Sequence, residues 1–156
     1  MESILKQVPM GINPVFSMAI VLVLAYIPHL MKKSLLTKKL KESSKQYTTA
    51  NSRGLTALMI DDSPLGMKIA NIAGCHQNGL EAFTYYSIAM LSCLLCKVDP
   101  IALSGAATVF ITIRCLYTFV YLSKFNGSPR TYLFFASAFF TLGMFYMAGS
   151  KYSADN

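Results

Sequence analysis

Four stretches of mostly apolar residues, separated by short polar segments, account for most of this chain and limit what it can fold into. Hydrophobic residues make up 54% of the 156 residues and charged residues 13%, about half the charged share of a soluble domain. A water-soluble chain of this length would leave much of that apolar surface in contact with solvent. The pattern predicts an all-α membrane protein: one domain over residues 1–156, built as a bundle of four transmembrane helices.

We expect the spans at about residues 14–31, 67–97, 101–122 and 130–149. The first span has no small-residue cleavage site after it, so we interpret it as a retained helix rather than a signal peptide. The second is continuously apolar only in its second half and is too long for the bilayer alone, so its start should project beyond the membrane. Leu35, Leu36 and Leu40 lie among lysines and predict a short interfacial helix after the first span.

The net charge of +7 is distributed in a way that indicates a membrane topology rather than nucleic-acid binding. Ten of the 14 lysines and arginines lie in the connectors after the first and third spans, and three lie on the opposite side. Short basic connectors beside membrane spans are typical of cytoplasmic loops. We therefore expect both basic loops in the cytoplasm, a lipid bilayer as partner and no nucleic acid. The membrane is the endoplasmic reticulum in a eukaryote and the inner membrane in a bacterium.

Neither the cysteines nor the histidines predict a metal site. Cys93 and Cys96 form a CxxC deep in an apolar run, which favours small buried side chains over redox chemistry. His76 has no second histidine or cysteine at metal-ligand spacing, because His29 belongs to another span. For His76 itself, a solvated or capping role at the interface is favoured over a catalytic one.

Two groups of polar residues lie inside predicted spans. The groups are Asn71, Asn78, Glu81 and Tyr85 in the second span and Arg114, Tyr117 and Tyr121 in the third. Their spacings of three, four and seven residues return to one helix face. An ionised side chain in hydrocarbon costs about 2.5 to 3.5 kcal/mol or more, so we hypothesise that Glu81 and Arg114 pair across the bundle. The spacing alone leaves a binding site and simple helix-to-helix adhesion equally open.

The same residues carry a family resemblance. Residues 76–83 read H-Q-N-G-L-E-A-F and resemble the H-x-N-x-x-E-A-F signature of the MAPEG family, the membrane-associated proteins in eicosanoid and glutathione metabolism. Residues 114–122 read R-C-L-Y-T-F-V-Y-L and are similar to that family's R-x-x-(H/Y)-x-x-x-Y-L segment. Arg130 begins the fourth span, where the prostaglandin E and leukotriene synthases of the family place a thiol-activating arginine. Residues 51–53, N-S-R, resemble the N-P-R of its bacterial-type branch.

The resemblance implies a homotrimer of four-helix bundles that binds glutathione between neighbouring subunits near the cytoplasmic face. It implies that Arg130 stabilises the thiolate and that Tyr121 lies with it in the catalytic site. The implied glutathione-binding residues are His76, Gln77, Asn78, Glu81, Arg114, Tyr117 and Tyr121. The implied activity is that of a glutathione-dependent membrane transferase or peroxidase, which conjugates or reduces lipophilic electrophiles.

The chain departs from the eicosanoid enzymes of the family at Gly74 and Gln77, where those enzymes carry arginines in the second span. Two alternatives therefore stay open: a MAPEG-like binding or scaffolding protein with reduced catalysis, and a small multidrug-type transporter subunit. A transporter of that kind also has four short spans and a membrane glutamate. The asymmetric loop charge and the position of Glu81 toward the cytoplasmic end favour the enzyme over the transporter.

Overall fold

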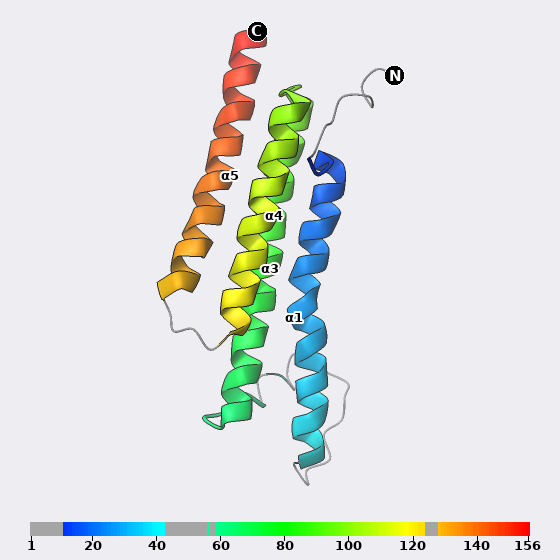
Figure 1. Ribbon diagram of the computed structural model, residues 1–156, viewed down its shortest axis with the longest axis vertical. Coiled ribbons are helices and arrows are strands. Elements are labelled where there is room, and N and C mark those ends of the chain that lie inside the picture. The colour runs from blue at the N-terminus through cyan, green and yellow to red at the C-terminus, as the bar shows by residue number, and fades with distance from the viewer. Residues whose placement is uncertain (1–10, 43–55, 57–58, 124–127) are drawn as a thin grey trace.

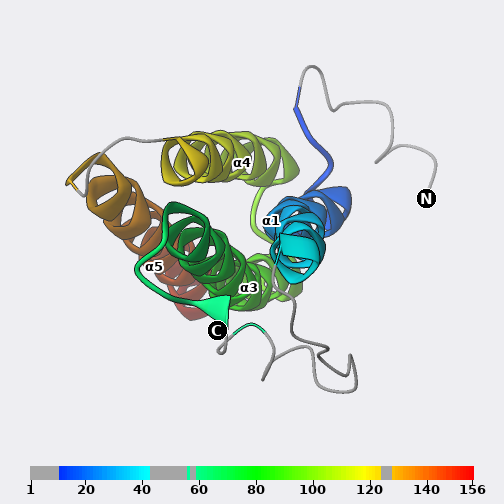
Figure 2. The same cartoon turned by 90° about the horizontal axis from the view of Figure 1, so that it is seen from below.

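The computed structural model describes residues 11–42, 56, 59–123 and 128–156, and within these ranges the chain forms long helices and no strands. The helices are α1 (Pro14–Glu42), α3 (Pro64–Leu95), α4 (Pro100–Leu122) and α5 (Ser128–Asp155). They alternate in direction, so that α1 and α4 run opposite to α3 and α5 (Figure 1). Helix α3 contacts each of the other three, and α1 and α5 lie on opposite sides of it (Figure 2).

Two helices begin with the same local device, a capping side chain followed by proline. Ser63 precedes α3, and its hydroxyl accepts a hydrogen bond of 3.0 Å from the backbone N–H of Gly66. Asp99 precedes α4 and accepts one of 2.9 Å from the N–H of Ala102. Proline fits the first helical position because its missing N–H has no partner there in any helix. The short turn between α3 and α4 therefore holds these two helices antiparallel, as the sequence predicts.

Three of the described helices are long and apolar enough to cross a membrane: α1 over Pro14–Lys41, α4 over its whole length and α5 over its whole length. Helix α3 has 32 residues and extends about 48 Å at 1.5 Å per residue, which exceeds the hydrocarbon thickness of a bilayer. Because its first half contains polar residues, α3 is not among the three helices that are apolar enough to cross a membrane. The expectation that α3 forms a fourth span stays a prediction.

The expected interfacial helix after the first span is wrong, because α1 continues without interruption to Glu42. Leu36 is buried and packs with Met59 and Ile69 in a small second core at this end of the bundle. Leucines among lysines here mark the inner face of a helix that leaves the membrane, rather than a helix lying on its surface. Burial against α3 stabilises this extension, since isolated short helices are marginal in water.

An ion pair closes the same end of the bundle. The Nζ of Lys39 lies 2.7 Å from the carboxylate of Asp61 and donates a hydrogen bond of 2.8 Å to the carbonyl of Met59. The carboxylate of Asp61 also accepts hydrogen bonds from the hydroxyl and N–H of Ser63. The hydrogen bonds from Lys39 and Ser63 lower the pKa of Asp61 to about 2. This contact ties the end of α1 to the residues that begin α3.

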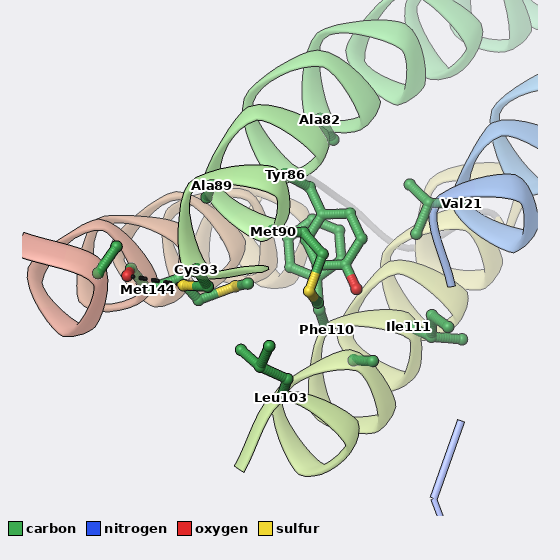
Figure 3. Close-up of a cluster of buried hydrophobic side chains, with 12 residues drawn as sticks. Val21, Ala82, Tyr86, Ala89, Met90, Cys93, Leu103, Phe110, Ile111 and Met144 are labelled. Carbon is green, nitrogen blue, oxygen red and sulfur yellow. Dashed lines mark hydrogen bonds between the residues drawn. The ribbon is translucent and has the colours of Figure 1, made fainter. Parts of the chain in front are cut away.

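The main core lies toward the other end of the bundle (Figure 3). The rings of Tyr86 and Phe110 stack with centroids 4.0 Å apart, and both side chains are fully buried. The Tyr86 hydroxyl lies 2.7 Å from the buried hydroxyl of Ser17 on α1. Cys93 is fully buried and its thiol donates to the carbonyl of Met144 on α5 over 3.2 Å. The interpretation of Cys93 as a small core residue is therefore confirmed.

Helices α1 and α3 are in close contact at Gly79. A Cβ added there would lie 3.0 Å from both Cα and Cβ of Ala25. Small residues let two helix backbones approach in this way. Just before this contact, the Nδ1 of His76 lies 2.8 Å from the carbonyl of Ala25. Backbone proximity therefore holds the α1–α3 interface together with two hydrogen bonds, that of His76 to the Ala25 carbonyl and that between Ser17 and Tyr86.

Candidate functional site

A cleft of about 370 Å³ opens between α3, α4 and α5, toward the end of the bundle where α3 and α5 begin. Its lining residues are Asn78, Tyr117, Tyr121, Arg130, Thr131, Phe134 and Phe135. The volume lies within the range of small-molecule sites in proteins. Four of these residues were predicted from the sequence as site residues, and the structure brings them together from three helices.

Two arginines and two tyrosines form a row, of which Tyr117, Tyr121 and Arg130 line the cleft, while Arg114 is buried beside it. The guanidinium carbon of Arg114 lies 4.2 Å from the ring centroid of Tyr117. The centroids of Tyr117 and Tyr121 are 5.4 Å apart. The guanidinium carbon of Arg130 lies 4.5 Å from the ring centroid of Tyr121. Each cation is therefore held over an aromatic face, an interaction that strengthens as water is removed.

Arg114 is buried, with 3% of its surface exposed, and it is only partly satisfied. Its Nη2 donates a hydrogen bond of 3.3 Å to the backbone carbonyl of Asn78. Its Nη1 is buried and has no hydrogen-bond partner among the described residues. The side-chain amide of Asn78 donates to the hydroxyl of Tyr117 over 2.7 Å. A buried guanidinium N–H without an acceptor is rare in proteins, and here it marks a donor for which the described residues supply no acceptor.

The hypothesis of an ion pair between Glu81 and Arg114 across one bundle is wrong. Glu81 is exposed, and its carboxylate accepts a hydrogen bond of 3.2 Å from the amide of Gln77. Ion pairs between described residues do not include these two. At 100° per residue, Glu81 lies about 60° around the helix from Asn78 and about 40° from Gln77. The sequence spacing placed Glu81 near the other polar residues of α3, but its angular offset from Asn78 turns its side chain away from the bundle.

Besides Glu81, three other predicted residues are not part of the cleft lining: Arg114, which is buried beside it, Gln77 and His76. Gln77 is exposed beside Glu81, and His76 faces α1. The rings of His76 and His29 lie 4.7 Å apart, so the structure joins two histidines that the sequence analysis kept separate. Nothing in the local sequence indicates this contact, because it depends on how α1 packs against α3. In the described part of the chain, no group of three or more potential metal ligands comes together.

Tyr121 also borders a second hollow, of about 380 Å³, on the α1 side of the cleft. Lys68 and Asn71 from α3 line this hollow with Tyr121 and Ser123 from the end of α4. A Cβ added to Gly74 would lie 2.6 Å from the Tyr121 hydroxyl. Sequence reasoning missed this role of Gly74, and it also missed Phe134 and Phe135 as lining residues. A glycine at 74 gives Tyr121 the space to lean against α3.

The fold and site define a helical integral membrane protein with a cation-bearing cleft near one end of its bundle. The model of the MAPEG family matches residues 14–150, which takes in nearly the whole of all four helices. The chain therefore belongs to the MAPEG family, and this supports a role in glutathione-related or eicosanoid metabolism at the family level. No curated protein and no solved structure shows a significant match to it.

Proposed function

We propose that this protein is a glutathione-dependent membrane transferase or peroxidase that acts on lipophilic electrophiles. The observation that carries the proposal is the buried guanidinium of Arg114, whose Nη1 has no partner in the described chain. A second guanidinium, that of Arg130, lies at the other end of the tyrosine row. Two cations without a carboxylate partner in the described chain, one lining a cleft of ligand size and one buried beside it, suit a small polyanion.

Glutathione fits this set of donors. It carries two carboxylates, an ammonium group and a thiol, and when bound it supplies the thiol nucleophile. Arg114 and the amide of Asn78 would hold a carboxylate, since both are hydrogen-bond donors at the cleft. Arg130 would stabilise the thiolate, because a neighbouring cation in a low-dielectric site favours the charged form of a thiol. Tyr117 and Tyr121 would orient both guanidinium groups.

The apolar wall of the cleft supplies a place for the second substrate. Phe134 and Phe135 line it from α5, and Phe135 is 51% exposed on the outer surface. In a bilayer, this surface faces the phase in which lipophilic compounds dissolve. An electrophile would therefore enter sideways from the membrane and meet a thiolate held by Arg130.

We also propose that the chain acts as a homotrimer with four spans and its basic end in the cytoplasm. Glu81 and Gln77 are exposed on α3 at a level where an ionised side chain facing lipid is costly. A neighbouring subunit against this face removes that cost. In the trimer, Glu81 would contribute the acceptor that the ammonium group of glutathione needs, and His76 and Gln77 would lie near the same boundary.

Binding without turnover is the second candidate function. Gly74 and Gln77 bring no cation to the cleft, and the Tyr121 hydroxyl occupies the space beside Gly74. A site with fewer cationic residues for the carboxylates of glutathione binds it less tightly and positions its thiol less well. In that case the protein would serve as a binding or scaffolding member of its family.

The test is to purify the protein in detergent and measure glutathione binding together with conjugation of an aryl halide. We expect both, and we expect Arg130→Ala to lower turnover by about a hundredfold or more, the range for losing an electrostatic stabiliser. Arg130→Lys is the matched control, because it keeps the charge and should recover part of the rate. Unchanged turnover in Arg130→Ala would remove Arg130 from the mechanism, and binding without any turnover would favour the second candidate.

A further inference from the structure

The outward face of α1 carries a continuous stripe that changes from apolar to basic along the helix. Two sets of residues at seven-residue intervals make up the stripe: Phe16, Val23, Leu30 and Thr37, and Ile20, Ile27, Ser34 and Lys41. Each seven-residue step turns by only about 20°, so each set drifts by about 60° over its length and stays on one side of the helix. The apolar members of both sets are exposed, from 37% for Ile20 to 69% for Phe16.

Where the stripe becomes polar, the helix surface has a shallow hollow of about 560 Å³. Its lining residues are Leu30, Lys33, Ser34, Thr37, Lys38 and Lys41. Lys33 and Lys38 lie about 8 Å apart along the helix axis, comparable with the thickness of the headgroup layer on one side of a bilayer. The hollow thus begins where the apolar stripe ends and extends into the headgroup region.

The lysines of this hollow differ from the lysine on the opposite face of the same helix. Lys39 lies about 180° around from Leu30 and is neutralised by Asp61. Lys33, Lys38 and Lys41 are all exposed, and none forms an ion pair with another described residue. Three ammonium groups therefore line one hollow, and their charge is not compensated by the described chain.

We propose that this face of α1 binds one anionic phospholipid, with its phosphate among Lys33, Lys38 and Lys41 and its acyl chains along Val23, Ile27 and Leu30. Ammonium groups provide the charge and hydrogen bonds for a phosphate, and the hydroxyl of Ser34 adds a neutral donor, whereas that of Thr37 donates to the carbonyl of Lys33. The exposed apolar stripe is what distinguishes a lipid from free phosphate as the occupant. Basic clusters immediately beside a span attract anionic lipids in this way. The inference is independent of glutathione chemistry, because the cleft lies between α3, α4 and α5.

The chain contains no tryptophan, which allows a site-specific test. Leu30→Trp places one fluorophore at the edge of the hollow, and Phe139→Trp places one on the exposed surface of α5 as the matched control. Each variant is reconstituted in phosphatidylcholine vesicles that contain a small fraction of phosphatidylglycerol. Bromine atoms are carried on the acyl chains of either the anionic or the zwitterionic lipid, in equal amounts. Quenching then reports which lipid lies beside the fluorophore.

We expect the Leu30→Trp fluorophore to show a local enrichment of the anionic lipid of about fivefold or more, the factor that one lysine near an anionic surface contributes. The Phe139→Trp fluorophore should show none. Adding Lys33→Gln, Lys38→Gln and Lys41→Gln should abolish the enrichment. Adding Lys68→Gln, Lys97→Gln and Lys151→Gln, an equal loss of charge elsewhere, should leave it intact.

Three results would overturn the proposal. Equal quenching by both lipids at the Leu30→Trp fluorophore would show that the hollow selects nothing. Equal loss of enrichment in the two triple-lysine variants would show that only net charge matters. Loss of enrichment on adding inorganic phosphate, but not chloride at the same ionic strength, would show that the hollow binds free phosphate instead.

Discussion

The hydroxyl of Tyr121 occupies the space in which a side chain at Gly74 would begin. A Cβ at this position would lie 2.6 Å from the hydroxyl oxygen and 3.6 Å from the ring carbon that bears it. The glycine and the tyrosine are therefore a matched pair across α3 and α4. An arginine at 74, as in the eicosanoid enzymes, requires a different position for Tyr121. The glycine indicates a cleft with its own arrangement rather than a simple loss of one cation.

The first prediction concerns this pair. In the wild-type background Gly74→Ala should destabilise the fold, since a contact below 3.0 Å forces Tyr121 to move. In a Tyr121→Phe background the remaining 3.6 Å contact is ordinary. There, Gly74→Ala should stabilise the protein by up to about 1 kcal/mol through helix propensity. Thermal unfolding of the wild type, the two single variants and the double variant in detergent measures whether the effect of Gly74→Ala on stability changes sign. The same effect in both backgrounds would contradict the contact between Gly74 and Tyr121.

The second prediction uses the absence of a carboxylate beside Arg114. Breaking a buried ion pair costs about 3–5 kcal/mol, because the partner is left charged and unpaired. Arg114→Met should cost less than that, because removing a buried unpaired cation offsets the loss of its hydrogen bond to the carbonyl of Asn78 and of its contact with the Tyr117 ring. Glutathione binding should fall by tenfold or more in the same variant. A large loss of stability in chemical unfolding would mean that Arg114 has an acidic partner after all.

The third prediction concerns how the stability of the fold depends on pH through the ion pair of Lys39 with Asp61. The pKa of Asp61 is lowered from 3.8 to about 2, so its ion pair with Lys39 stabilises the fold fully above pH 3.8. That contribution is lost as the pH falls through about 2. In Asp61→Asn the midpoint of unfolding should depend less on pH between these two pH values. Asp62→Asn, at the adjacent exposed aspartate, is the control and should keep the wild-type profile.

The fourth prediction tests the hydrogen bond between the hydroxyls of Ser17 and Tyr86. Both side chains are fully buried, and the two oxygens lie 2.7 Å apart. Ser17→Ala leaves the Tyr86 hydroxyl without this partner and should cost about 1–3 kcal/mol. In a Tyr86→Phe background the same substitution should cost clearly less. Equal costs in a double-mutant cycle would show that the hydrogen bond adds nothing to stability.

Much of the fold was predictable because its signals are local. Apolar runs, the basic connectors and the turn at Asp99 and Pro100 predicted the order of the helices and most of their bounds. The inner leucines of the α1 extension were misread, because Leu36 is buried by Met59 and Ile69, which are far away in the sequence. A short apolar pattern among lysines does not reveal whether another helix covers it.

The candidate site was predictable in part. Asn78, Tyr117, Tyr121 and Arg130 were identified by motif and spacing, and they meet at one cleft. The position of Glu81 was not predictable, because an offset of about 60° decides whether a carboxylate faces the bundle or its surroundings. Contacts between distant segments, such as that of His29 with His76, depend on helix packing and leave no local signal.

Because Gly79 has no Cβ, its backbone packs directly against Ala25, and this contact sets the distance between the axes of α1 and α3. A Cβ at position 79 would lie 3.0 Å from Ala25, so α1 and α3 would have to shift by a few tenths of an ångström there, and this bears on the pairs of groups that bridge them. Those pairs include Ser17 with Tyr86 above the contact and Lys39 with Asp61 below it. The cost of a single methyl group at 79 therefore depends on whether these two contacts can accommodate that shift.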